Sequence, residues 1–342
     1  MLGCVSTDRT DSPFVNGLLS EVEVLLTESV AGSTANGYAG HWKRWVNFCV
    51  EHGLVPLPAK VDQLCAYFLH LATLGNSMSA ALSARAAIGF FHKLQLPASE
   101  SPTESVRVSM TFAGLKRRYA KPPKKAMKFT ADSLKKVRDH LMGGDPVSLK
   151  NFRMAAWAVA AWHCMARYEE LSKVGFGNVK VLAGGSLELF VESGKSYAKD
   201  DPRTGVVAAT GREDCPVEFL LSYMDFARDK YPVGIEMFLF PSLTPKNIPM
   251  PKTMSYQSGL RQLRAATNAL NIPVEDSKRF GLHSCRGGAA TAASNAGVPL
   301  QAIQEAGRWT SESAPKGYIE PSEEVRGLVS RTLSSLSGSS QE

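Results

Sequence analysis

The stretch HSCRGGAATAASNAGVPLQAIQEAGRWTSESAPKGYIE, residues 283–320, places four large or reactive side chains among mostly small ones. His283 and Arg286 stand three positions apart, so both side chains lie on one face if a helix begins here. Trp309 follows Arg286 by 23 positions, and Tyr318 follows Trp309 by nine. We expect the glycines and alanines directly after Arg286 to let a ligand backbone approach closely.

Each of these residues has an ordinary structural explanation when it is taken alone. A His-x-x-Arg pair is usually a solvated helix start, Trp309 is more often a core residue, and Tyr318 can simply pack its ring. Their combination favours chemistry. Arginines grip a phosphate with a planar fork and keep their charge, histidine donates a hydrogen bond or moves a proton, and tyrosine can be a covalent nucleophile. Such a set of side chains is suited to binding a phosphodiester and attacking its phosphorus.

Length and composition exclude several classes of protein. A chain of 342 residues exceeds the usual single-domain size, so two domains are expected. No stretch approaches the roughly 20 apolar residues of a membrane span, and residues 1–30 lack the pattern of a secretory signal. The six cysteines are scattered without a C-x-x-C pair, so we expect them to be reduced. Cytoplasm or nucleus remains as the location.

The hydrophobic pattern divides the chain into two domains joined by a linker. Residues 1–120 contain four or five helical patterns with short connections, which is typical of a helical bundle. Residues 121–129 form the linker, and residues 130–342 form a second domain that is mainly α. Within it, residues 178–195 and 204–210 predict a small antiparallel sheet. From Pro216 onwards the pattern is helical again.

Positive charge gathers around the predicted linker. The formal net charge of +7 favours a polyanionic partner. The stretch KRRYAKPPKKAMKFT, which begins at Lys116, is either a solvated connector or a strap across a phosphate backbone that also serves as a nuclear import signal. The cations expected to contact such a backbone are Lys116, Arg117, Arg118, Lys121, Lys124 and Lys125.

Motifs for other phosphate and hydrolytic chemistry do not occur in the sequence. The seven histidines are dispersed, without H-E-x-x-H or Cys/His pairs at zinc spacing. Neither a G-x-x-x-x-G-K-[ST] phosphate loop nor a G-x-S-x-G elbow occurs. We therefore expect no metal site and no cofactor, and we exclude the familiar ATPase and hydrolase classes.

Taken together, the residues of the 283–320 stretch resemble the tyrosine recombinases, the class of DNA strand-exchange enzymes that includes phage integrases and Cre. The order His283, Arg286, Trp309 and Tyr318 is similar to the family's H-x-x-R, His/Trp and Tyr arrangement, with spacing like that of Cre. The wording HS-x-RGGAATAA and GRW-x-S looks more like recombinases of eukaryotic mobile elements, of the DIRS, Ngaro or Crypton kind.

The resemblance extends to further residues and has departures. ARYEEL resembles the segment around the family's first catalytic arginine, so it assigns that role to Arg167 and a supporting role to Glu170, whose alternative is an ordinary first-turn helix acid. The family's lysine lies on a β-hairpin, where Lys195 is the better match and Lys199 the alternative. The departures are Gly287, where many members have histidine, Arg308 before the tryptophan, and Pro315 near the tyrosine.

The resemblance implies a fold and a mechanism. The fold is a SAM-like core-binding bundle followed by an α+β catalytic domain with a small antiparallel sheet. The two arginines and His283 would bind the non-bridging oxygens of the scissile phosphate, and Trp309 would donate its indole N–H or pack behind them. Tyr318 would attack phosphorus to give a 3′-phosphotyrosyl link, and Lys195 would protonate the departing 5′-oxygen. Neither ATP nor a metal is needed for this exchange.

The resemblance also implies partners. Double-stranded DNA is the substrate, and we expect a homo-oligomer on it, a dimer per site and a tetramer at synapsis. An apolar stripe in the tail would dock on a neighbouring copy or pack within the chain; it consists of Val325, Leu328, Val329 and Leu336. The location is the nucleus in a eukaryotic host and otherwise the cytoplasm with the nucleoid.

Three other functions remain open from the sequence. A type IB topoisomerase shares the tyrosyl chemistry, a DNA-binding protein can keep the fold without activity, and an unrelated helical interaction protein would make the spacing accidental. The sequence identifies neither the target DNA site nor whether cleavage occurs in cis or in trans.

Overall fold

The computed structural model describes residues 11–30, 32–74, 78–96, 100–119, 126–191, 203–231 and 237–338. The chain divides into two compact units, Met1–Pro123 and Lys124–Glu342, and each is described by itself. Within the described residues, none of the helices combines the length and the apolar character that crossing a bilayer requires.

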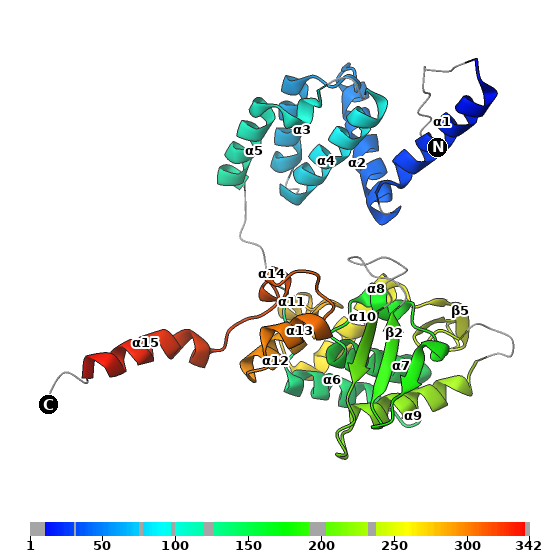
Figure 1. Cartoon of the computed structure of the whole chain (residues 1–342), viewed down its shortest axis with the longest axis vertical. Helices are drawn as coiled ribbons and strands as arrows, with labels where there is room; N and C mark the ends of the chain where they lie inside the picture. Colours follow the sequence, from blue (N-terminus) through cyan, green and yellow to red (C-terminus); the bar gives the residue numbers. More distant parts are fainter. Residues whose placement is uncertain are drawn as a thin grey trace. The chain divides into compact units, whose positions relative to one another are not determined.

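Unit 1 is a bundle of helices (Figure 1). Its elements are α1 (Pro13–Glu28), α2 (Gly32–Glu51), α3 (Val61–Thr73), α4 (Met78–Gln95), the short 3-10 helix η1 (Pro102–Glu104) and α5 (Val106–Tyr119). Trp45 of α2 and Phe68 of α3 are fully buried, and Phe68 packs on Phe112 of α5 with ring centroids 4.9 Å apart. The helices therefore bury their large residues on a shared core, as helical spacing of apolar positions requires.

Unit 2 is built around one apolar helix, α7 (Leu149–His163), against which the helices α6 (Ala131–Met142) and α9 (Pro216–Arg228) pack. Most residues of α7 are buried, including Trp157, as its continuous apolar sequence predicts. Thr130 caps α6 through a reciprocal pair of bonds with Ser133. The other helical elements are α8 (Tyr168–Ser172), η2 (Phe176–Asn178), α10 (Tyr256–Ala266), η3 (Thr267–Leu270), α11 (Val274–Ser277), α12 (Ser284–Asn295), α13 (Leu300–Ala306), α14 (Ser313–Lys316) and α15 (Glu323–Gly338).

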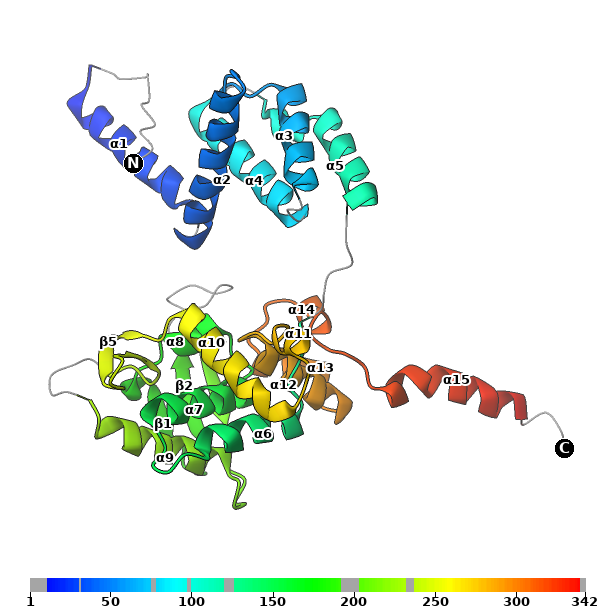
Figure 2. The same ribbon diagram turned by 180° about the vertical axis from the view of Figure 1, so that it is seen from behind.

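A three-stranded antiparallel sheet lies beside α7 and has the order β1 (Val179–Val181), β2 (Leu187–Val191) and β3 (Arg203–Val207). Leu187, Leu189 and Val191 alternate toward the core, as a strand with one buried face requires. The predicted fold class, mainly α with a small antiparallel sheet, is confirmed. Figure 2 shows the same arrangement from behind.

The prediction that the pattern is helical from Pro216 onwards is wrong for residues 241–253. A second antiparallel pair forms there from β4 (Pro241–Leu243) and β5 (Pro249–Thr253). Prolines stand in both strands and cannot donate ladder hydrogen bonds, so the sequence PSLTPKNIPMPKT lacks the usual strand pattern. A two-stranded ribbon tolerates them, because each strand has a free edge.

The expectation that the small residues after Arg286 admit a ligand is also wrong at Gly288. A Cβ at this position would lie 2.1 Å from the carbonyl oxygen of Phe129 and 2.8 Å from the ring of Trp162. Phe129 is held there because its N–H donates to the carbonyl of Ser284, at 3.3 Å. Gly288 therefore serves close packing of α12 inside unit 2.

Candidate active site

Arg167 reaches the site through a tight turn after α7. Met165, in this turn, has a φ of +45°, a left-handed conformation that is uncommon for residues other than glycine. Arg167 is the N-cap of α8. Its backbone N–H donates to Glu170 Oε2 at 2.9 Å, and its Nη1 donates to Oε1 at 2.6 Å.

Glu170 is shared by three arginines. Its side chain is fully buried and contacts Arg167 as above, Arg308 Nη2 at 2.9 Å and Arg286 Nη1 at 3.9 Å. Burial by itself would raise the pKa of this carboxyl, but the charge of Arg308 and the backbone N–H of Arg167 lower it below the ordinary value. Glu170 is therefore ionised at neutral pH. It contacts three arginines, which distinguishes it from an ordinary acid in the first turn of a helix.

Arg286 lies in the first turn of α12 and is completely buried. Its Nη1 donates to the carbonyl of Met165, and its Nη2 donates to that of Gly307 at 2.6 Å. Burial, followed by the nearby charge of Arg167, lowers its pKa to about 10, so the guanidinium stays charged at neutral pH. The turn before α8 and the segment after α13 are thus tied to one side chain.

His283 caps α12 and is exposed, in contrast to the buried Arg286. Partial desolvation, and then the charges of Arg286 and Arg167, lower the pKa of the imidazole. His283 is therefore neutral at neutral pH and can accept or donate a proton.

Trp309 and Tyr318 cover the Arg286 guanidinium. The central carbon of the guanidinium lies 3.9 Å from the ring centroid of Trp309 and 5.5 Å from that of Tyr318. The two rings are 5.3 Å apart. The indole Nε1 of Trp309 is buried and finds no acceptor among the residues that the structure describes. A phosphate reaches Arg286 only after these rings shift.

The segment that carries Tyr318 is anchored through its backbone. The carbonyl of Pro315, in α14, accepts the N–H of Tyr318 at 2.8 Å, so the proline supports the turn that presents the tyrosine. The carbonyl of Tyr318 accepts from Lys128 Nζ and from Thr291 Oγ1, the latter at 3.1 Å. Lys128 also pairs with Glu320 at 3.1 Å.

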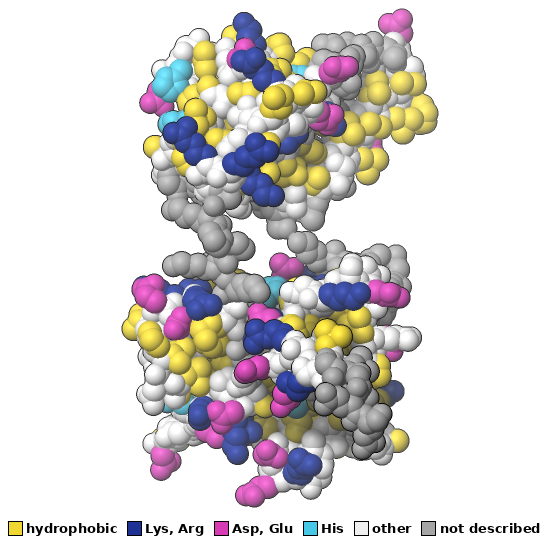
Figure 3. Space-filling view, turned by 90° about the vertical axis from the view of Figure 1, so that its left-hand side faces the viewer, with side chains coloured by type: hydrophobic (Ala, Val, Ile, Leu, Met, Phe, Trp, Pro, Cys, Tyr) yellow, Lys and Arg dark blue, Asp and Glu magenta, His cyan; other side chains and the backbone are white. Residues whose placement is uncertain are grey.

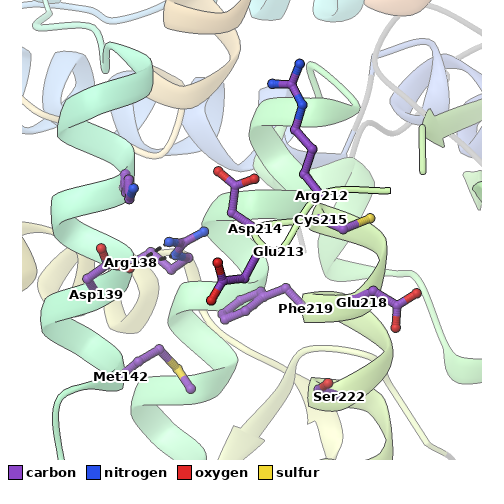
Figure 4. Close-up of a pocket in the computed structure, with 11 residues that line it drawn as sticks. Arg138, Asp139, Met142, Arg212, Glu213, Asp214, Cys215, Glu218, Phe219 and Ser222 are labelled. Carbon is purple, nitrogen blue, oxygen red and sulfur yellow. Dashed lines mark hydrogen bonds and ion pairs between the residues drawn. The ribbon is translucent and has the colours of Figure 1, made fainter. Parts of the chain in front are cut away.

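A cavity of about 370 Å³ opens beside this segment, with His283, Lys128, Lys316 and Tyr318 in its lining. A larger cavity, of about 800 Å³, lies elsewhere, between α6, the start of α9 and the residues before it (Figure 4). Its lining mixes cations such as Arg138 with several acids, and it includes no predicted site residue. The smaller cavity therefore fits an anion better.

The remaining predicted residues lie apart from this cluster or outside the described residues. Lys116, Arg117 and Arg118 are exposed in the last turn of α5, in unit 1. On the face of unit 1 that Figure 3 shows, Lys and Arg side chains gather, whereas on unit 2 they alternate with acidic ones. The lysines outside the described residues are Lys121, Lys124, Lys125, Lys195 and Lys199. For the described residues, no group of three or more His, Cys, Asp or Glu side chains is placed to hold a metal ion.

Sequence reasoning missed two contributors to the site. Arg308, noticed only as a departure from the family, is buried against Glu170. Lys128 stood within the basic stretch, but nothing in the sequence indicates that it binds the backbone of Tyr318. The only signal for Arg308 was a second arginine directly beside the predicted tryptophan.

Comparisons with known proteins agree with this architecture. No protein-family model matches the chain. Over 303 residues, 85% of this chain and 84% of the relative, the sequence is 22% identical to the recombinase Cre of Escherichia phage P1.

Solved structures give the fold. The Tn1549 transposon integrase in complex with circular intermediate DNA has a TM-score of 0.62 at 12% identity, covering 92% of this chain and 98% of the integrase. A lambda integrase dimer bound to a COC′ core site has a TM-score of 0.58 at 15% identity, covering 90% and 96%. The chain therefore has the fold of the tyrosine recombinases, and the predicted resemblance to them is confirmed. Its further resemblance to recombinases of eukaryotic mobile elements stays a prediction.

Proposed function

We propose that the protein is a site-specific DNA recombinase or integrase that cleaves and rejoins DNA strands through a 3′-phosphotyrosyl intermediate. The observation that carries the proposal is the convergence of Arg167 and Arg286, from separate segments, on Glu170, with Tyr318 beside the second guanidinium. Such a concentration of fixed positive charge stabilises the charge that develops on a phosphate during transfer. The sequence similarity to Cre supports the same activity.

The residues have distinct roles in the proposed reaction. Arg167, Arg286 and the neutral His283 bind the non-bridging oxygens. The indole N–H of Trp309, which has no acceptor among the described residues, is a further donor. The phenol of Tyr318 gives its proton to the neutral His283, which lines the same cavity, and its oxygen forms a bond to phosphorus while the bond from phosphorus to the 5′-oxygen breaks. The leaving oxygen takes a proton from Lys195, with Lys199 as the alternative. One ester replaces another, so the step needs no ATP.

DNA is the proposed partner, with the protein acting as a dimer on each site and a tetramer at synapsis. The lambda integrase that shares the fold was solved as a dimer bound to a core site. Val325 and Leu328 of α15 are exposed, which leaves apolar surface for a second copy. We propose that the protein acts where genomic DNA lies, in the nucleus of a eukaryotic host or the nucleoid of a bacterium.

Substitution of Tyr318 by phenylalanine tests the activity. Tyr318→Phe keeps the ring on Trp309 but removes the nucleophile, so we expect DNA affinity within about twofold of wild type, because the change removes one hydroxyl and no charge. We expect no covalent adduct. The measurement is denaturing electrophoresis after incubation with nicked suicide substrates, made from DNA sites selected from a random pool.

The matched control is Tyr256→Phe, which removes the hydroxyl of an exposed tyrosine in α10 and should leave adduct formation unchanged. An adduct with Tyr318→Phe would show that another residue is the nucleophile. Exchange between two separate sites, rather than relaxation of one supercoiled circle, distinguishes a recombinase from a type IB topoisomerase.

A further inference from the structure

Arg308 has an unusual backbone and an enclosed side chain. Its φ of +55° lies in the left-handed region that glycine adopts without strain, and its side chain is only 2% exposed. A non-glycine residue persists in this conformation when its surroundings hold it there. The side chain keeps the backbone in this conformation, because its guanidinium donates to four acceptors.

The acceptors around Arg308 come from separate parts of unit 2. Its Nη2 donates to Glu170 Oε2 and to the carbonyl of Cys164, both at 2.9 Å. Its Nη1 donates to the carbonyl of Ala306 at 3.0 Å and to that of Thr204 at 3.5 Å. One guanidinium thus joins the end of α7, the buried carboxylate of α8, the end of α13 and the start of β3.

The backbone of β3 is fitted to this side chain. A Cβ at Gly205 would lie 2.8 Å from the Cβ of Cys164 and 3.2 Å from Arg308 Nη1. Glycine at this position therefore lets the strand approach the guanidinium closely. β3 follows directly on residues 192–202, the stretch that contains the predicted catalytic lysine.

A buried arginine with these contacts does not bind DNA itself. Its two terminal nitrogens carry four N–H groups and make four hydrogen bonds to protein acceptors, whereas those of Arg286 make only two among the described residues. We propose that Arg308 is a positioning residue: it holds the Glu170 carboxylate between Arg167 and Arg286 and ties β3 to that cluster. This inference rests on the proposed strand transfer and assigns a role to a residue that touches no reacting atom.

The charges around Glu170 explain why Arg308 affects the ionisation of this carboxylate. Arg167, Arg286 and Arg308 face the carboxylate, and the other titratable groups near it are the Cys164 thiol and His283. Burial raises the pKa of Cys164 to about 12, so the thiol is neutral. Arg308 gives the largest of the effects that keep Glu170 ionised, ahead of Arg167 and Arg286.

Arg308→Gly is the sharpest test, because glycine keeps the left-handed backbone while it removes the guanidinium. We expect DNA affinity to stay within about twofold, since no phosphate contact is lost. Single-turnover cleavage of a suicide substrate should fall about 100-fold, the loss expected when a reacting group is displaced by about 1 Å. Lys278→Gln removes an exposed cation paired with Glu275 and is the control for charge alone.

The pH profile separates positioning from packing. The pKa of Glu170 is lowered in the folded protein, so its ion pairs are present above the ordinary carboxyl pKa and are lost as the pH falls. Without Arg308 the pKa of Glu170 is lowered less, so the ion pairs of Glu170 begin to be lost at a higher pH. The rate ratio of wild type to Arg308→Gly should therefore be larger at about pH 5.5 than at about pH 8. Arg308→Lys restores the charge and should return the ratio toward its wild-type pH dependence.

Several outcomes would overturn the proposal. One is a cleavage rate of Arg308→Gly equal to that of wild type, and another is a loss of cleavage rate that is the same at every pH. A third is a double variant with Glu170→Gln whose loss of cleavage rate is the product of the two single losses. Residues that act through each other should instead give a double variant no worse than the poorer single one. If Arg308→Gly does not fold, Arg308→Lys and Glu170→Gln carry the same comparison.

A failure of the proposed function is recognised separately. If wild-type protein traps no DNA, strand transfer itself is wrong. The pairing of Arg308 with Glu170 is then still measured without DNA, from the pH dependence of thermal unfolding. Wild type should lose stability at a lower pH than Arg308→Gly, and coincident profiles would contradict the pairing.

Discussion

Individual residues define the site through a small excess of buried positive charge. Three arginines surround one carboxylate, so the cluster keeps a net positive charge in a region with little water. Buried charges are tolerated when they are paired and hydrogen-bonded, and the carbonyls of Met165, Gly307 and Cys164 complete the pairing here. The excess charge is what a phosphate would neutralise.

Two neighbouring glycines of α12 should respond differently to alanine. Gly288→Ala would place a methyl 2.1 Å from the Phe129 carbonyl, so we expect the free energy of unfolding to fall by about 1–3 kcal/mol. At Gly287 the nearest atom is the flexible Lys128 side chain at 3.4 Å, so Gly287→Ala should be neutral or stabilise by up to about 1 kcal/mol. Urea denaturation measures both. Equal stability of the two variants would contradict the packing of α12 described above.

At the scale of elements, the short helices α8 and α14 lie beside Arg167 and Tyr318, whereas the longer α12 carries Arg286. α8 has five residues and α14 four, too short to be stable alone, whereas α7 is buried along most of its length. The short helices therefore keep their positions through contacts with the rest of unit 2, among them those of Glu170 and Pro315.

The last turn of α5 provides a test of DNA binding by unit 1. Lys116, Arg117 and Arg118 are exposed, and replacing all three with alanine should weaken binding similarly for all sequences. The slope of log K against log salt should become shallower by up to about 3, since each phosphate contact contributes about 0.9. Fluorescence anisotropy over a salt series measures this slope.

The control for this variant removes three exposed cations that are each paired with a carboxylate on the same helix. These are Lys136, Arg228 and Lys278. We expect the control to keep the wild-type slope. An unchanged slope for the α5 variant would remove these residues from the DNA-binding surface.

At the scale of the whole molecule, α15 has no buried side chain among those that the structure describes. Val325, Leu328 and Leu333 are exposed on it, while Val329 and Leu336 of the predicted stripe have side chains outside the described residues. A chain that ends at Pro321 should still cleave a single site, because Tyr318 and its anchors remain. It should lose cooperative binding to two-site DNA, measured by gel shift. Undiminished cooperativity would exclude α15 as the contact between copies.

The sequence by itself determined the helical bundle and the three-stranded sheet, and its continuous apolar run predicts the buried helix α7. It also named candidate reactive residues, and these assignments stay predictions. Periodicity is a local property of the chain, so it predicts helices and strands wherever one face is buried. The spacing from His283 to Tyr318 also predicted the resemblance to the tyrosine recombinases, because these residues lie within one continuous segment. Glu170 was marked as a supporting residue through its place beside Arg167.

Only the tertiary structure decided how these parts meet. Arg308 joins Glu170 because a left-handed turn directs it inward, and no sequence pattern predicts that φ. Gly288 serves packing rather than a ligand, because Phe129 lies against α12. The β4 and β5 pair was hidden by its prolines. For Arg308 and Gly288 the deciding contact joins segments far apart in the sequence, and such contacts depend on the folded backbone rather than on local residue preferences.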